Sequence, residues 1–257
     1  MGLRIGTSGF QHPHWRGIVY SRDIPEREWL ATYADEFDTV ELNTPFDRLP
    51  TVRTLRAWHQ DVPEGFTFAV KASRTIGDVR QPEEMTGAIT RFIDRVRELG
   101  DALGPILVRL PPDAPAAPRR LEEALAAFPA EMRVALEPRH PSWFVPVIRR
   151  ILRDHGAALC VSDRRGVITP VIRTADWAYV RLEEGRAKPG PCYGIRALRA
   201  WADRLDDLVP DDDMGYVFFG NDGYGCAVAN ARTLRRLSGA DPRRRAIEMY
   251  PRAAQSS

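Results

Sequence analysis

The chain has 257 residues, a formal net charge of +2 and 44% apolar residues, and it contains three cysteines. A domain of this length buries roughly 75% of the surface that its unfolded chain exposes, so it needs neither disulfides nor a metal ion to fold. We therefore exclude a disulfide-dense secreted scaffold and interpret Cys160, Cys192 and Cys226 as reduced thiols. The near-neutral charge also argues against a protein that coats DNA.

No run of the sequence approaches the ~18 apolar residues of a membrane-spanning helix. The first residues, MGLRIGTSGF, lack the apolar stretch of a signal peptide. We expect a cytoplasmic protein that has no membrane partner and is a monomer or a weak dimer. We predict a single domain over residues 1–257, with a loose tail over residues 240–257.

Eight short runs rich in branched and aliphatic residues recur at fairly even spacing, which is typical of buried strands. They cover residues 3–7, 39–43, 67–72, 106–110, 133–137, 158–162, 178–182 and 215–219. Apolar residues at helical spacing separate most of them, and strands that alternate with helices pair in parallel. Eight such units predict an α/β fold, a (β/α)8 TIM barrel with a parallel eight-stranded barrel.

Two details qualify this fold prediction. An open doubly wound sheet is the alternative, but no G-x-G-x-x-G motif follows the first strand. Residues 164–176 show no clear helical period, so the sixth helix is expected to be irregular or missing.

Charged side chains gather on the inward faces of the predicted strands, near their carboxyl ends. Side chains alternate between the two faces of a strand, so the apolar residues that meet the helices fix which neighbours point inward. The inward polar set is Glu41, Asn43, Lys71, Arg109, Glu137, Arg139, Arg181 and Glu183. Charges are seldom buried unless they are paired or functional, and barrels form their active sites at this end. The alternative is a structural ion-pair network, for instance Glu137 with Arg181 and Glu41 with Lys71.

The residue types in this set suggest a small anionic ligand. Guanidinium groups suit carboxylate or phosphate oxygens, while carboxylates can transfer protons. Lys71 is one of only two lysines, which favours a base, an electrostatic stabiliser or a Schiff-base nucleophile. We predict catalytic roles for Glu41, Lys71, Glu137, His140 and Asp163. We predict substrate-binding roles for Trp15, Asn43, Arg48, Arg74, Arg109, Arg139, Trp143, Arg181, Asn221 and Asp222.

The histidines do not form a strong metal motif. His12 and His14 lie in a loop as H-P-H, and neither H-E-x-x-H nor a clustered Cys/His spacing occurs. We predict no metal ligands and no required cofactor, although a Glu/His/Asp set around His140 could hold a divalent ion.

Two long connections are candidate functional loops. Residues 8–28 contain Phe10, Trp15 and Tyr20, which could cover a sugar or a base or could simply pack against the barrel rim. Residues 183–194, rich in glycine and proline, form a second candidate lid.

Ordered motifs along nearly the whole chain resemble the YecE-like family, known as domain of unknown function 72. They are R-I-G-T-S-G at 4–9, W-R-G at 15–17, V-E-L-N at 40–43, R-L-P at 48–50, F-A-V-K-A-S-R at 68–74, L-P-P at 110–112, L-E-P-R-H-P-S-W at 136–143, Y-V-R-L at 179–182 and N-D at 221–222. The resemblance implies a TIM-type barrel and intracellular occurrence in bacteria or archaea. It implies no established activity.

The chain departs from the family pattern at several rim positions. They are Pro45, Asp47, Gly77, Asp78, Arg109, Glu183 and Gly220, and two of the replaced family residues are histidines. A metal-dependent role for the family therefore transfers poorly to this chain.

We expect an enzyme that acts on a phosphorylated or carboxylated substrate by general acid–base chemistry. Arg109, Arg139 and Arg181 would hold the anion, and Glu41 or Glu137 would transfer the proton. The alternatives are a nucleic-acid-processing, phosphodiesterase-like barrel, whose first loop would stack on a base, and a non-catalytic metabolite-binding protein.

Overall fold

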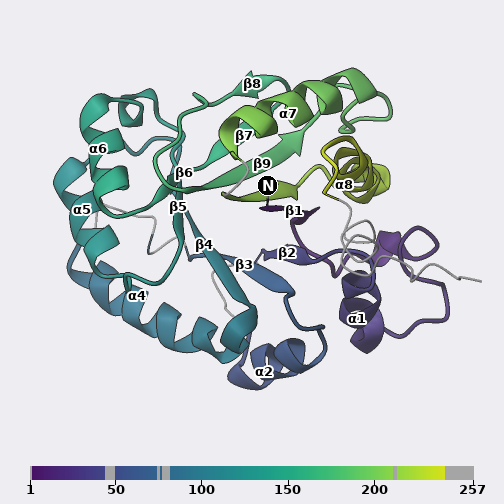
Figure 1. Ribbon diagram of the computed structural model, residues 1–257. Helices are drawn as coiled ribbons and strands as arrows, with labels where there is room; N and C mark the ends of the chain where they lie inside the picture. Colours follow the sequence, from purple (N-terminus) through teal and green to yellow (C-terminus); the bar gives the residue numbers. More distant parts are fainter. Residues whose placement is uncertain (1, 44–49, 74–75, 77–81, 211–212, 241–257) are drawn as a thin grey trace, which may run out of the picture.

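The structure is a computed structural model that describes residues 2–43, 50–73, 76, 82–210 and 213–240 (Figure 1). Arg48, Arg74 and the expected tail at 241–257 lie outside the described residues. The same holds for four of the family departures, Pro45, Asp47, Gly77 and Asp78.

The strands are short and follow the predicted runs closely. They are β1 (Gly2–Thr7), β2 (Thr39–Leu42), β3 (Thr67–Lys71), β4 (Leu103–Arg109), β5 (Val134–Glu137), β6 (Ala158–Leu159), β7 (Val161–Arg164), β8 (Val167–Ile168), β9 (Trp177–Glu184) and β10 (Met214–Phe219). Within the described chain they form two five-stranded sheets, in the orders β1-β10-β9-β7-β8 and β2-β3-β4-β5-β6. Every pair is parallel except the β7–β8 hairpin.

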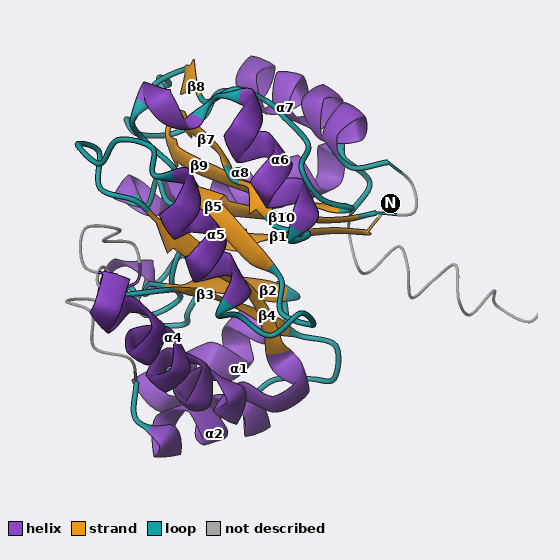
Figure 2. Cartoon of the chain, turned by 90° about the vertical axis from the view of Figure 1, so that its left-hand side faces the viewer, coloured by secondary structure: helices purple, strands orange, loops and turns teal. Residues whose placement is uncertain are grey.

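Helices connect the strands and lie outside them (Figures 1 and 2). The α-helices are α1 (Trp29–Ala34), α2 (Val52–Gln60), α4 (Pro82–Val96), α5 (Pro118–Ala126), α6 (Pro146–Asp154), α7 (Ile195–Leu208) and α8 (Cys226–Leu237). Short 3-10 helices are η1 (Pro13–Trp15), η2 (Glu26–Glu28), η4 (Arg97–Ala102), η5 (Pro141–Trp143) and η6 (Gly223–Gly225). The parallel α/β prediction is confirmed.

Local sequence explains several helix starts. The Thr51 hydroxyl caps α2 by accepting a hydrogen bond from the Thr54 amide. Proline occupies the first turn of α5 at Pro118 and of α6 at Pro146, where the missing amide hydrogen costs nothing. No helix forms between β7 and β9, where every residue is described and the β7–β8 hairpin takes its place. The expectation for the sixth helix is therefore confirmed.

The two sheets meet at two seams. At the first, Cys160 alone separates β6, which pairs with β5, from β7, which pairs with β9. At the second, an isolated bridge between Ser8 and Glu41 joins the end of β1 to β2. The ladders of the described residues thus do not run continuously through all eight units, so a closed eight-stranded barrel stays a prediction.

The seam between β1 and β2 depends on one glycine and one tyrosine. A Cβ atom on Gly6 would lie 2.2 Å from the Thr39 carbonyl oxygen, so only glycine permits this approach. The Thr7 amide donates to the Tyr33 hydroxyl over 3.0 Å, and that hydroxyl donates to the Thr39 carbonyl over 3.1 Å. Helix α1 therefore supplies a link between the two strands.

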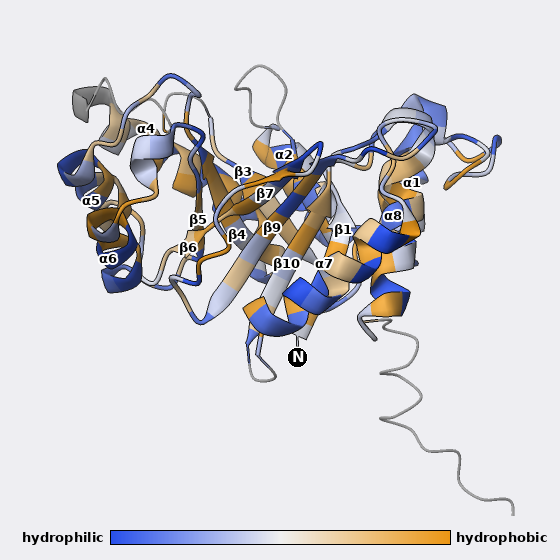
Figure 3. Cartoon of the chain, turned by 90° about the horizontal axis from the view of Figure 1, so that it is seen from above, coloured by the Kyte–Doolittle hydropathy of each residue, from blue (hydrophilic) through white to orange (hydrophobic). Residues whose placement is uncertain are grey.

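The apolar core has two layers, as the alternation of the strands predicts. Hydrophobic residues colour much of the central strands (Figure 3). The larger layer lies between strands and helices and includes Val40, Phe68, Val70 and Val180. The smaller one gathers the inward residues Ala69, Leu107, Ala135, Ala158, Cys160, Trp177, Tyr179, Tyr216 and Phe218. This inner layer fills the space between the sheets and leaves the charged residues at the carboxyl ends of the strands.

The cysteine prediction is wrong for two of the three residues. Cys192 and Cys226 form a disulfide, while Cys160 is a buried free thiol. The disulfide fixes the loop after β9 to the first residue of α8, two segments that are 34 residues apart. Sequence spacing could not show this pairing, because the fold alone brings the two segments together.

None of the described helices combines the length and apolar character required to cross a membrane.

Candidate functional site

Charged residues from β2, β5 and β9 meet at the carboxyl ends of the strands. The central group is Arg181, whose guanidinium is almost fully buried. Its Nε and Nη2 atoms each donate to Glu41 over 3.0 Å. Its Nη1 atom donates to Glu137 over 2.9 Å and to Glu183 over 2.5 Å. Each guanidinium nitrogen thus binds a carboxylate, so Arg181 holds the site together and is not the ligand clamp that we expected.

The carboxylate of Glu41 is also fully hydrogen-bonded. Its two oxygens accept hydrogen bonds from Arg181, from the Ser8 hydroxyl and from the Tyr179 hydroxyl, the last over 2.7 Å. Burial alone would raise the pKa of Glu41, but the charge and hydrogen bonds of Arg181, with those of Ser8 and Tyr179, hold it below the ordinary value. Glu41 is therefore a fixed carboxylate and a poor group for proton transfer.

Glu137 differs from Glu41 in one respect. Its Oε2 atom accepts the bond from Arg181, but its Oε1 atom is buried and accepts no hydrogen bond. The Nε atom of Arg109 lies 3.6 Å from Oε1. A buried acceptor without a donor is costly, so this oxygen is suited to receive a proton or a ligand donor.

An outer set of cations surrounds Glu183. Arg109, Arg139 and Arg164 lie 3.6, 3.8 and 3.3 Å from its carboxylate. Burial, with Arg109 as the largest repulsive charge, lowers the pKa of Arg139, which shows that the cations crowd each other. The three guanidinium groups keep 24%, 28% and 54% of their side-chain surface exposed, so solvent reaches this side of the cluster.

Lys71 completes the cluster at the end of β3. Its Nζ atom donates to the Asn43 side-chain oxygen over 3.3 Å. Burial, followed by the charges of Arg109 and Arg181, lowers the pKa of Lys71. The expected pairing of Glu41 with Lys71 is replaced by the pairing of Glu41 with Arg181, whereas the expected pairing of Glu137 with Arg181 is confirmed.

Two predicted site residues lie in the helical layer. Asp163 shares the outward face of β7 with Val161, and its oxygens accept from the Gly166 amide and the Trp201 indole. Trp143 lies in the apolar core and donates to the Ala114 carbonyl. The structure therefore corrects the roles that we predicted for Asp163 and Trp143, because both are bound within the helical layer.

His140 also has a structural contact, since its Nδ1 atom accepts from the Ser142 amide at the start of η5. Asn221 is buried, and its amide nitrogen donates to Pro191 and Asn230. It therefore helps to fix the loop that carries Cys192.

The aromatic residues of the first connection are buried. Phe10, Trp15 and Tyr20 expose 3%, 0% and 0% of their surface, so none offers a face to a base. Tyr20 stacks on Trp29 at 4.8 Å, and the Trp15 indole donates to Asp222 over 2.6 Å. The second interpretation of this loop, packing against the rim, is correct.

Sequence reasoning missed some members of the cluster. Ser8 follows β1 directly, and its position at the strand end could have indicated its role. Arg164 lies two residues after the inward Ser162 on β7, so the alternation of the strand could have indicated its inward face. Glu183 was assigned an inward face but no function, and Tyr179 was given no role.

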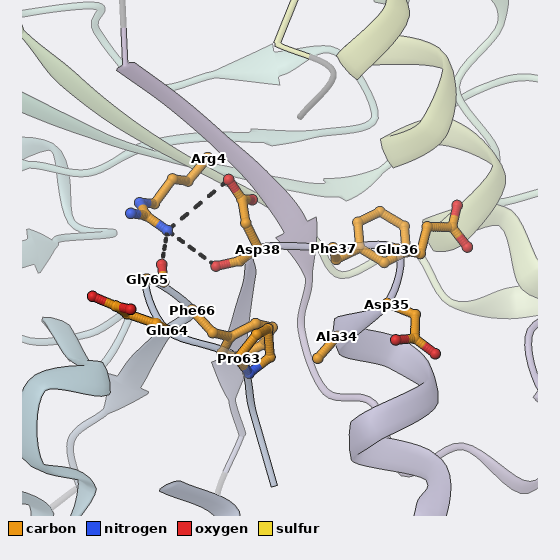
Figure 4. A pocket seen from close by; sticks show the side chains of 10 residues that line it. All are labelled: Arg4, Ala34, Asp35, Glu36, Phe37, Asp38, Pro63, Glu64, Gly65 and Phe66. Atoms are coloured by element: carbon orange, nitrogen blue, oxygen red, sulfur yellow. Dashed lines mark hydrogen bonds and ion pairs between the residues drawn. The ribbon is translucent and has the colours of Figure 1, made fainter. Parts of the chain in front are cut away.

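A cavity of about 380 Å³ lies at the opposite, amino-terminal ends of β1, β2 and β3 (Figure 4). The guanidinium of Arg4, which lines the cavity, donates to the carbonyl oxygens of Asp38 and Gly65 (Figure 4). Another lining residue, Glu36, forms a bidentate ion pair with Arg232. These polar groups join neighbouring loops, and this end of a barrel usually serves stability.

Comparison with known proteins agrees with this architecture. YunF of Bacillus subtilis (strain 168), a UPF0759 protein, is 23% identical over 273 residues, which cover 91% of this chain and 94% of that protein. A DUF72 family protein of Thermotoga maritima MSB8 has a structure with a TM-score of 0.76 and 27% identity, covering 92% of this chain and 99% of that one. An L-ribulose 3-epimerase shares only the TIM-barrel-like fold, with a TM-score of 0.50 and 15% identity over 99% of this chain and 100% of that one.

A family model extends the agreement to residues 4–255, almost the whole sequence. Two sheets of parallel strands, their outer helices and this match lead to one conclusion: the chain belongs to the family described as protein of unknown function DUF72.

Proposed function

We propose that this protein is an enzyme that acts on a small anionic substrate by general acid–base chemistry. The site is the charged cluster at the carboxyl ends of the strands, formed by Glu137, Glu183, Lys71, Arg109 and Arg139. One observation carries the proposal: the Oε1 atom of Glu137 is buried beside Arg109 and accepts no hydrogen bond.

The surrounding charges support an anionic substrate. All three central carboxylates, Glu41, Glu137 and Glu183, are already paired with Arg181, so the outer cations share negative charge with that group. Burial and then the charge of Arg109 lower the pKa of Arg139, and an anion between Arg109 and Arg139 would offset the repulsion between them. Their planar guanidinium groups suit a phosphate or a carboxylate.

Glu137 would transfer the proton, because Glu41 is saturated with donors. Lys71 would stabilise the anion in its charged form or act as a second base in its neutral form, which its lowered pKa favours.

We also propose that the two sheets work as one eight-stranded barrel. The bridge between Ser8 and Glu41 and the one-residue gap at Cys160 support this view. A cytoplasmic location and a monomer or weak dimer remain part of the proposal, to be tested by cell fractionation and size-exclusion chromatography.

The first test is a thermal-shift screen of the protein with phosphosugars, nucleotides and organic acids. We expect at least one anion to raise the melting temperature, and Arg139→Ala to abolish the shift. Glu123→Gln, which alters an exposed ion pair with Arg119 on α5, is the matched control and should respond like the wild type. If no anion shifts the melting temperature, or if Arg139→Ala keeps the shift, the proposed binding site is wrong.

The second test separates catalysis from binding. With the ligand found in the screen, Glu137→Gln should keep binding but lose turnover, because the amide cannot accept the proton. Binding without product in the wild type would identify a metabolite-binding protein instead. Binding of oligonucleotides that falls steeply with added salt would support the nucleic-acid alternative.

A further inference from the structure

We propose that His12, His14 and Asp222 form a binding site for a divalent transition-metal ion such as Zn²⁺. The proposal is separate from the proposed function, because it concerns binding at the rim beside η1 and needs no substrate. The sequence pattern alone predicted no metal ligands at His12 and His14.

The three side chains converge although 208 residues separate the loop after β1 from the loop after β10. The Nδ1 atom of His12 lies 3.0 Å, and the Nε2 atom of His14 lies 2.9 Å, from the same Oδ2 atom of Asp222. All three ligand atoms lie within 4.8 Å of one another. Among the residues that the structure describes, this is the one such group of three.

These distances are close to those around a bound ion. Zinc bonds to imidazole nitrogen and carboxylate oxygen of about 2.0–2.2 Å place neighbouring tetrahedral ligands about 3.3 Å apart. To admit the ion, the two nitrogen–oxygen distances would widen by a few tenths of an ångström, and the two ring nitrogens, which lie within 4.8 Å of each other, would take up the same spacing. Two imidazoles and one carboxylate are also a ligand set that zinc and iron(II) sites use, with positions left open.

Hydrogen bonds outside the group orient two of the three ligands. The Nε2 atom of His12 lies 3.3 Å from the Ser8 carbonyl oxygen, which accepts a hydrogen bond in the tautomer that has its proton on Nε2. That tautomer leaves the Nδ1 lone pair for the ion. The Oδ1 atom of Asp222 accepts from the Trp15 indole over 2.6 Å, which leaves Oδ2 for the ion. Such outer partners are typical of metal-binding histidines and carboxylates.

Asp222 contacts both histidines. Its Oδ2 atom faces the Nδ1 atom of His12, and its carbonyl oxygen lies 3.0 Å from the Nε2 atom of His14. His14 is half-exposed, so an ion can reach the site from solvent.

The experiment uses the full, untagged chain after removal of metal by a chelator. Titration calorimetry with Zn²⁺, and the visible absorption of added Co²⁺, are measured for the wild type, His14→Ala and Asp222→Asn. His59→Ala is the matched control, because His59 pairs with a single carboxylate, Asp101, over 2.7 Å.

We expect the wild type and the control to bind one equivalent of ion. His14→Ala and Asp222→Asn should bind it at least about 100-fold more weakly, beyond the ~10–100-fold cost of losing an outer partner. Absence of binding by the wild type, or equal binding by His14→Ala and Asp222→Asn, would overturn the proposal and leave the contacts of Asp222 with the two histidines as structural ones.

We expect His14→Ala and Asp222→Asn to leave the fold intact. His14 has a half-exposed side chain, and asparagine at position 222 can still accept from Trp15. Their melting temperatures without metal should match that of the wild type, and added Zn²⁺ should raise only those of the wild type and the control.

Discussion

At the scale of single residues, Arg181 decides what the neighbouring carboxylates can do. It pairs with Glu41 and Glu137 in a buried setting and helps to hold the pKa of Glu41 below its ordinary value, and the cost of burying these groups is offset only while all partners remain. The cluster thus contains a structural part, centred on Arg181, and an outer part that is open to a ligand.

The first prediction concerns the structural part. Glu41→Gln removes the carboxylate that binds two nitrogens of Arg181 and should lower the free energy of unfolding by about 3–5 kcal/mol. Urea unfolding at neutral pH measures the change. The same substitution at Glu123, in an exposed pair on α5, should cost only about 0.3–0.5 kcal/mol. Equal losses in both variants would show that the buried pair contributes no more than a surface pair.

The second prediction concerns pH. The pKa of Glu41 in the folded protein is below its value in the unfolded chain, so its contribution is complete above the unfolded value of about 4.3. That contribution is lost as the pH falls through the folded pKa. The gap in unfolding free energy between the wild type and Glu41→Gln should therefore narrow below about pH 4.3. Unfolding curves at several acidic pH values measure it, and a gap that stays constant would contradict the lowered pKa.

At the scale of elements, the sequence predicted the strands and the faces on which Lys71, Glu137 and Arg181 lie. The reason is physical: the period of two between apolar residues is a local property of each strand. Asp163 was expected to follow the strand at 158–162 at the rim, but it lies within β7 on its outward face, one residue after the inward Ser162. The alternation of apolar residues also could not predict the contacts of His12 with Asp222 or of Cys192 with Cys226, because those contacts depend on how distant loops are placed.

The third prediction tests the close contact between β1 and β2. Gly6→Ala places a methyl group against the Thr39 carbonyl and should destabilise the fold by about 1–3 kcal/mol. Gly87→Ala within α4 is the control, since alanine favours a helix there and only the flexible end of Arg91 is near. Thermal unfolding of both variants compares them. If Gly6→Ala is as stable as Gly87→Ala, the seam is looser than the structure indicates.

At the scale of the whole molecule, the disulfide links a loop at the carboxyl ends of the strands to the last helix. Closing a loop of this length restricts the unfolded chain and contributes about 3–4 kcal/mol of stability in the chain-entropy account.

The fourth prediction follows from that link. A thiol reductant should lower the melting temperature of the wild type but leave that of Cys226→Ser unchanged, because the variant has no disulfide to lose. Cys160 remains in both proteins and serves as the internal control for other thiol effects. A wild-type melting temperature that ignores the reductant would show that the two cysteines are not joined in solution.

The hydroxyl of Tyr33 has a consequence for how the chain assembles. It links the Thr7 amide of β1 to the Thr39 carbonyl of β2 in place of a direct backbone hydrogen bond, although Tyr33 itself lies in α1. The link through Tyr33 therefore forms only when α1 has docked, and we expect β1, α1 and β2 to fold cooperatively. Tyr33→Phe removes the linking oxygen atom and should weaken this coupling.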